Sequence, residues 1–513
     1  MSANAEVVAP ALPADLSHSP LLGIAGVVLG AGIVTLAGRL ISLGLADLKG
    51  NVGISFDQGA WIGSAFNVAL MFIGPFTVYL GALAGARPVL LTGAAVFTVV
   101  SACLPFVHDY RLLIVLLAIA GLASGTFYPL TLTFALRNIP LRYLAIVLGL
   151  YATSVEFAVN FAPSLYGFYR DHLSWEWMFW TSAVITPVMM ACVYYGIPPS
   201  PNAPRSTAAP SFVGFFYTSA GFALLYAALD QGQRLDWWRS GVFAALFAAG
   251  AFLLLCGVAR RLRRPNMFVD LPYLWQWNTM LLALALSAFR FVLLATILIV
   301  PQSLSVRGLD AGQLAPAVVW TAVAELVLAV FAAHLLNKGL DSRLVMGIGF
   351  ALIAIGCVIN SNYTSVWAAE NYYRTELLMA AGQSFAFVGV VSTMILHSVA
   401  SGGLQSPFRA LTFSAFFHTV RLFGGQIGVA LLGHFIAERE QLHSYLIGLH
   451  VHMGAAAGRA AAIVDARVRL QAYTLTYIDS FHLIVWVCVC TLVLIAMLRR
   501  APLSYGDLAR DGR

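Results

Sequence analysis

The stretch Tyr151-Ala-Thr-Ser-Val-Glu-Phe-Ala-Val-Asn-Phe-Ala-Pro-Ser-Leu-Tyr-Gly-Phe-Tyr169 lies in an apolar run of membrane-spanning length, yet carries the carboxylate Glu156 near its middle. Its small and polar residues recur at steps of three and four and therefore share one helical face: Ala152, Glu156, Asn160, Pro163 and Gly167. A charge at bilayer depth costs at least about 2.5–3.5 kcal/mol, so Glu156 should face a partner or a water-filled cavity. Two interpretations stay open, a functional pathway or a buried structural acid that is ion-paired or permanently protonated.

The composition of the chain indicates a polytopic membrane protein. Of its 513 residues 60% are hydrophobic and only 10% are charged, whereas soluble domains have about 25% charged residues. All six cysteines fall inside apolar runs without metal-ligand spacing, so neither a disulfide framework nor a redox pair is expected. Residues 1–20 contain no Lys or Arg, which predicts a short tail and not a cleavable signal peptide.

A hydropathy window of about 19 residues predicts an all-α integral membrane protein with fourteen transmembrane helices. These spans are 21–46, 58–82, 88–108, 111–136, 144–169, 176–197, 211–230, 240–260, 276–300, 313–336, 343–362, 376–400, 409–436 and 478–499. The proline-rich tract 198–204 and the basic tract 260–265 divide the chain into six spans, a helical hairpin and six further spans. The expected domains are a tail (1–20), a six-helix bundle (21–197), linkers with the inserted hairpin (198–275), a second six-helix bundle (276–500) with an external loop (437–477), and a tail (501–513). This arrangement is typical of a transporter built from two parallel repeats.

The distribution of charge predicts that both termini lie in the cytoplasm. Connections on the N-terminal side carry most of the basic residues: Arg87, Arg137, Arg142, Arg205, Arg260, Arg261, Arg263, Arg264, Lys338, Arg343, Arg409, Arg499, Arg500, Arg510 and Arg513. Loops on the other side have mixed signs: Asp47, Lys49, Asp57, Arg170, Asp171, Glu176, Glu370, Arg374 and Glu376. The formal charge of +7 is therefore a topology signal and not a nucleic-acid footprint.

Five ionisable residues are expected within the spans, and they are the candidate functional groups: Arg39, Glu156, Arg290, Glu325 and Arg421. Two acids and three bases could pair into buried networks, which would lower their insertion cost. His418 lies one turn before Arg421, and Gly424, Gly425 and Gly428 follow it at a spacing that permits close helix approach. No histidines share a helix at ligand spacing with a carboxylate, so no metal site is expected, and without a P-loop an ATP-driven pump is not expected either.

Several motifs together resemble the fourteen-span drug:proton antiporter branch of the major facilitator superfamily. They are Gly50-Asn-Val-Gly53 with Gln58-Gly-Ala-Trp61, Pro163 with Gly167, Leu229-Asp-Gln-Gly232 with Asp236-Trp-Trp238, Pro265 with Val269-Asp-Leu271, Pro301-Gln302 and Arg421-Leu-Phe-Gly-Gly-Gln-Ile-Gly428. The family's first-span acid would fall near Ala37, where the nearby charge is Arg39, and its fourth-span Arg aligns with Leu117. The loop 81–87 lacks the family's Asp, and Ala162 replaces a glycine.

The resemblance implies a proton-coupled exporter of hydrophobic or aromatic small molecules, powered by the proton gradient without a cofactor. It also implies an inner-membrane setting with a periplasmic adaptor protein and an outer-membrane channel as partners. From the residues, Glu156 and Glu325 are the proton-carrier candidates, and the charge-network candidates are Arg39, Asn160, Arg290, His418 and Arg421. An importer of organic anions, a non-transporting receptor and a lipid-handling membrane protein remain as alternatives.

Overall fold

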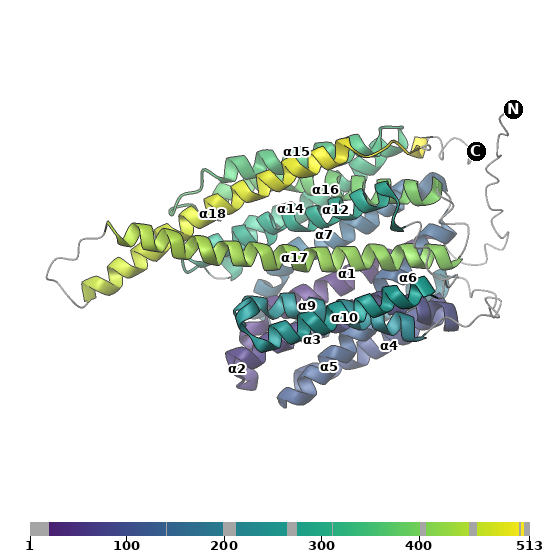
Figure 1. The fold of residues 1–513 in the computed structure, drawn as a ribbon, viewed down its shortest axis with the longest axis horizontal. Helices are drawn as coiled ribbons and strands as arrows, with labels where there is room; N and C mark the ends of the chain where they lie inside the picture. Colours follow the sequence, from purple (N-terminus) through teal and green to yellow (C-terminus); the bar gives the residue numbers. More distant parts are fainter. Residues whose placement is uncertain are drawn as a thin grey trace.

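The computed structural model describes residues 20–139, 141–197, 212–263, 274–309, 311–400, 407–450, 459–501 and 504–506. Fourteen helices in this part are long and apolar enough to cross a membrane, which confirms the predicted all-α fold and the span count. In a bilayer every backbone polar group needs an internal partner, and a helix supplies one within a single segment. An even number of crossings puts the start of α1 and the end of α18 at one face, here called the terminal face, and the opposite one is the far face. Figure 1 shows the terminal face at the right.

Seven of the spans precede the hairpin's second helix. They are α1 (Pro20–Leu43), α3 (Phe56–Ala84), α4 (Ala86–Cys103), α5 with α6 (Tyr110–Ser124 and Phe127–Asn138), α7 (Leu141–His172), α8 (Trp177–Gly196) and α9 (Phe212–Gly232). A short α2 (Leu45–Val52) connects α1 and α3 at the far face. Ser55 and Gln58 form a capping box that begins α3, and the Asp109 carboxylate caps α5.

The other seven spans start with α10 (Gly241–Arg263). They continue with α12, η3 and α13 as one broken helix (Trp277–Val292, Ala295–Ile299 and Val300–Ser305), α14 (Ala311–Asn337), α15 (Ser342–Asn360), α16 (Ala369–Ala400), α17 (Pro407–Gly448) and α18 (Arg459–Ala496). The middle of the ninth span, η3, is a π-helical turn directly before Pro301. Such turns occur where the regular hydrogen-bond ladder is interrupted.

The expected loop 437–477 is wrong in its extent, because helix covers most of it. α17 continues to Gly448 and α18 begins at Arg459, and the two project together beyond the bundle at the far face (Figure 1). Charged pairs hold this extension: His443 Nε2 lies 2.9 Å and Arg439 Nε lies 3.4 Å from Asp479 Oδ2. A hydropathy criterion ends a span where polar residues begin, whereas the helix itself continues.

Glu370, Arg374 and Glu376 do not lie in a loop as expected. All three lie in α16, and the Glu376 side chain is fully buried. The spans therefore hold a third buried glutamate that hydropathy alone places at a helix edge.

Two apolar clusters form the core. One joins buried residues of α3, α4, α5 and α8, and the other joins α12, α14, α15, α16 and α18. The second cluster also includes Val27 of α1, Leu132 of α6 and Tyr151 of α7, so it runs across the junction between the two halves of the chain. The hairpin α9–α10 lies beside α3, and α10 packs mainly on α9 (Figure 1).

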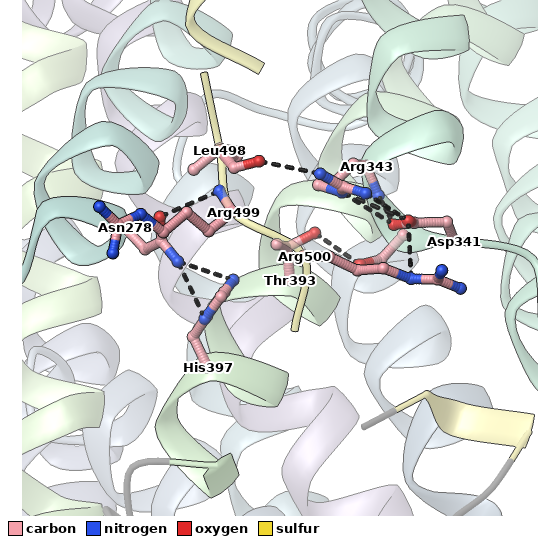
Figure 2. Close-up of polar contacts among 9 residues, drawn as sticks. Asn278, Asp341, Arg343, Thr393, His397, Leu498, Arg499 and Arg500 are labelled. Atoms are coloured by element: carbon pink, nitrogen blue, oxygen red, sulfur yellow. Dashed lines mark hydrogen bonds and ion pairs between the residues drawn. The ribbon is translucent and has the colours of Figure 1, made fainter. Parts of the chain in front are cut away.

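At the terminal face, a set of polar contacts ties the segment after α18 to α12 and α15 of the second half (Figure 2). Arg343 Nη1 donates to the Leu498 carbonyl at 2.8 Å, and the Arg499 amide donates to Asn278 Oδ1 at 3.2 Å. Asp341 caps α15 and pairs with Arg343 at 2.8 Å. We call Asn278, Asp341, Arg343, Leu498 and Arg499 the terminal-face clamp.

Candidate functional site

Asn160 on α7 bridges the two halves of the molecule. Its Nδ2 lies 3.1 Å from each carboxylate oxygen of Glu325 on α14 and 3.3 Å from Gln383 Oε1 on α16. Gln383 Nε2 in turn donates to Thr296 Oγ1 of η3 at 2.9 Å. All four side chains are buried. Two of the residues singled out from sequence, Asn160 and Glu325, are thus in direct contact across the junction.

Glu376 lies beside this bridge. Thr321 Oγ1 donates to Glu376 Oε2 at 2.9 Å, while Glu376 Oε1 is buried with no hydrogen-bond partner in the described part of the chain. Thr321 and Glu325 are four residues apart on α14, and Glu376 and Gln383 are seven apart on α16, so each pair occupies one helical face. Sequence reasoning missed Glu376, although its two-turn spacing from the polar Gln383 was an available signal.

Glu156 lies one turn before Asn160 on α7 and is 2% exposed. Neither of its carboxylate oxygens has a hydrogen-bond partner among the described residues. Arg290 of α12 and Arg421 of α17 act on it electrostatically without direct contact. The expectation that the acids and arginines pair directly is therefore not met at Glu156 or at Glu325, which is bonded to an amide.

Arg421 packs face-on against an aromatic ring. Its guanidinium carbon lies 3.9 Å from the centre of the Tyr128 ring on α6, and its Nε is buried without a hydrogen-bond partner in the described residues. His418, one turn earlier on α17, is fully buried, with its ring centre 5.3 Å from that of Tyr128. A cation over an aromatic face is attracted by the ring quadrupole. Arg421 thus connects α17 to a helix of the first half.

The glycines after Arg421 bring α17 close to α12. A Cβ at Gly424 would lie 2.4 Å from Ser287 Oγ, and one at Gly425 would lie 3.3 Å from Arg290 Nε. At Gly428 the nearest atoms belong to Phe291. The charge of Arg290 is in this way packed directly against the backbone of α17.

Arg39 contacts the broken ninth span. Its Nη2 donates to the Ile297 carbonyl at 2.7 Å. In a regular α-helix this carbonyl would accept from residue 301, but Pro301 has no N–H. The Arg39 side chain supplies the missing donor and joins α1 to η3. On α7, Pro163 and Gly167 lie within the helix, toward the far face from Asn160.

A fourth acid, the half-buried Asp230, connects the inserted hairpin to both halves. Its carboxylate accepts hydrogen bonds from Ser64 of α3, from the neighbouring Gln231 at 3.3 Å and from Gln426 of α17 at 3.2 Å. Hydropathy places Asp230 at the end of a span, so these contacts were not predicted. Its position in a glutamine-rich motif was the available signal.

Among the described acids of this site, Glu325, Glu376 and Asp230 accept hydrogen bonds from amides or hydroxyls. Glu156 has no such partner and lies near Arg290 and Arg421 without ion-pairing to them. The neutral form of a carboxyl group costs much less to bury than its anion. Such groups can gain and release a proton when the surrounding helices move.

The family model of the Major Facilitator Superfamily matches residues 27–429. Curated relatives cover most of the chain. The multidrug export protein EmrB of Escherichia coli is 24% identical over 79% of this chain and 78% of its own. The EmrB protein of Haemophilus influenzae is 22% identical over 80% of both chains. The fatty acid resistance protein FarB of Neisseria gonorrhoeae is 22% identical over 85% of this chain and 86% of its own.

The fourteen spans, the contacts between the two halves and the family match agree with one another. The chain is a multi-pass membrane transporter that belongs to the Major Facilitator Superfamily.

Proposed function

We propose that the chain exports hydrophobic or aromatic small molecules across the inner membrane in exchange for protons. The observation that carries the proposal is the buried Asn160–Glu325 contact, which joins a carboxyl group of the second half to an amide of the first. The names of the relatives, two multidrug export proteins and a fatty acid resistance protein, support the same class of solute.

Alternating access would couple proton binding to conformation at this contact. When α7 separates from α14 and α16, Glu325 loses the donor that stabilises its anion and becomes easier to protonate. Glu156 would respond to the same movement, because the distances to Arg290 and Arg421 determine how far its anion is stabilised. A solute that binds only one conformation would then exchange against a proton.

The direct test uses purified protein in proteoliposomes loaded with a fluorescent hydrophobic dye. An imposed proton gradient should accelerate dye movement against the direction of proton flow. A dye gradient should in turn drive protons in the direction opposite to the dye. Dye exchange that ignores the gradient would exclude coupling. A susceptibility panel in an export-deficient host that expresses the chain would then define the solutes.

The importer of organic anions is not favoured. Of the three buried arginines that it would use for a carboxylate, Arg39 is hydrogen-bonded to the Ile297 carbonyl and Arg421 is stacked on Tyr128. Only Arg290 has two nitrogens, Nε and Nη1, without a partner among the described residues. Accumulation of an organic anion inside the same proteoliposomes would restore that alternative, and binding without any flux would favour a receptor.

We also propose that a periplasmic adaptor protein, linked to an outer-membrane channel, binds the α17–α18 extension. In support, this extension projects beyond the bundle at the far face and exposes apolar residues such as Tyr445 and Leu446. A photo-crosslinking amino acid at Leu446 in living cells should capture the adaptor. The same residue at the exposed Val366, between α15 and α16, is the control, and equal capture at both positions would contradict the proposal.

A further inference from the structure

A large cavity lies apart from the polar contacts of the candidate site, between the inserted hairpin and the rest of the molecule. It has a volume of about 600 Å³, within the range of about 300–1,000 Å³ typical of small-molecule pockets. Its walls come from α3, α9, α10, α12 and α17. The lining residues lie near the start of α9, α12 and α17 and the end of α10, so the cavity occupies the membrane half next to the terminal face.

The walls of the cavity are mainly apolar. Prominent among them are Phe215, Phe222, Met280, Leu284, Phe416 and Phe423. Four hydroxyl-bearing residues also line it: Thr218, Ser287, Thr412 and Thr419. Three of these hydroxyls donate within their own helix: Thr218 to the Gly214 carbonyl at 3.0 Å, Ser287 to the Ala283 carbonyl at 3.0 Å and Thr419 to the Ala415 carbonyl at 2.8 Å. The protons of these three hydroxyls therefore need no acceptor on an occupant. The interior of the cavity is therefore suited to a hydrocarbon chain.

One charged group lines the cavity, at its terminal-face end. Arg260 is half-buried in the last turn of α10, and its Nε is buried without a hydrogen-bond partner in the described residues. A guanidinium with a free, desolvated N–H is well suited to a carboxylate or another anionic head group. Arg263, one turn later, is exposed and does not line the cavity.

We propose that this cavity binds a single-chain anionic amphipath, such as a long-chain fatty acid, from the leaflet at the terminal face. The anionic head lies on Arg260 at the level of the lipid head groups, and the chain extends inward between α9, α12 and α17. The inner end of the chain reaches Ser287 and Gly424, one helical turn from Arg290. An occupant there separates the hairpin from the junction between the two halves. Binding of the amphipath at this site does not require proton-coupled export.

Photolabelling of purified protein in nanodiscs of zwitterionic lipid tests the proposal without any gradient. The probes are a diazirine-bearing palmitate and the matching fatty alcohol, and mass spectrometry locates the labelled residues. In the wild type, palmitate should label the lining of α9, α12 or α17. Arg260→Gln should reduce palmitate labelling at least fivefold and leave the alcohol nearly unchanged, whereas Arg263→Gln should affect neither.

Filling the cavity provides an independent arm. Ala283→Phe should reduce labelling by both probes, and Leu255→Phe, at an α10 position that is 68% exposed, should not. Thermal unfolding of each variant shows whether it is folded. Labelling spread evenly over the lipid-facing side of α10, or a palmitate signal that Arg260→Gln leaves intact, would overturn the site. Displacement of palmitate by an equimolar two-chain anionic phospholipid would overturn the single-chain assignment.

Discussion

At the residue scale, the buried glutamate without a hydrogen-bond partner is the group whose function is most directly testable. If Glu156 carries the proton, Glu156→Gln should lower flux driven by a pH gradient at least tenfold, because the amide cannot release a proton. Dye exchange without a gradient should stay within about twofold of the wild type, since an amide of the same shape keeps the packing. Proteoliposome flux measures both quantities.

The control for Glu156 is Glu370→Gln, which changes an exposed acid at the start of α16 and should alter neither quantity. If Glu156→Gln follows the pH gradient as the wild type does, then Glu325 or Glu376 remains as the carrier. If Glu156 alone carries the proton, Glu325→Gln should act mainly on solute affinity. Loss of pH-driven flux in Glu325→Gln would instead assign proton binding to the Asn160–Glu325 contact.

Arg421 provides the second prediction at this scale. Arg421→Lys should reach the membrane at near-normal levels but transport poorly, because a compact ammonium cannot stack its charge flat on the Tyr128 ring. Cation–π contacts contribute about 0.5–2 kcal/mol to stability. Tyr128→Leu removes this contact and should therefore lower the unfolding temperature. Arg421→Ala should be the most damaging, since it leaves Glu156 with one fewer nearby positive charge. Normal transport by Arg421→Ala at normal expression would contradict this role.

At the element scale, the cap of α15 gives the chain a pH-dependent contribution to stability. Burial acts to raise the pKa of Asp341, but the hydrogen bonds and charge of Arg343, with Arg500 nearby, outweigh it and hold the pKa below its ordinary value. A carboxylate with a lowered pKa stabilises the fold above the pKa it has when unfolded, about 4, and this contribution is lost as the pH falls through the lowered value.

We therefore expect the wild type to be more stable than Asp341→Asn at pH 7, and the difference to shrink as the pH falls below about 4. Asparagine keeps a capping oxygen, so the comparison isolates the charge. Thermal unfolding in detergent across this pH range measures the stability difference between the wild type and Asp341→Asn. Asp109→Asn on α5 is the capping control outside the clamp. A difference that does not vary with pH would show that the Asp341 charge does not stabilise the fold.

The elements also show how far sequence reasoning reaches. Each span could be predicted because a membrane helix satisfies its own backbone, so a local count of apolar residues suffices. The common face of Glu156 and Asn160 follows from helical spacing for the same reason. The contact of Asn160 with Glu325 could not be predicted, because it depends on which helices are neighbours. The contacts of Glu376 and Asp230 could not be predicted for the same reason, because their hydrogen-bond partners, Thr321 and Ser64, lie on other helices.

At the scale of the whole molecule, the arginine distribution predicts that the terminal face is cytoplasmic. In a variant without native cysteines, an impermeant thiol reagent added to intact cells should label Thr364→Cys, between α15 and α16, and not Lys338→Cys, between α14 and α15. Both positions are exposed and should react after permeabilisation. The reverse pattern would invert the topology. Ser200, Asn266 and Gly454, which the sequence assigns to the same two sides, lie outside the described residues.

The terminal-face clamp affects which mutations the chain can accumulate. Leu498 enters it through its main-chain carbonyl, which any residue can provide. Arg499 enters it through its main-chain amide, which any residue other than proline can provide. Asn278 and Arg343 enter it through their side chains, and an Arg-to-Lys exchange at 343 would not preserve the geometry. Over evolutionary time the identity at 499 is therefore free to drift, with proline excluded, while position 498 stays apolar because its side chain is buried in the core and selection acts on the two anchors inside the bundle. Descendants of this chain should differ at position 499 and agree at Asn278 and Arg343.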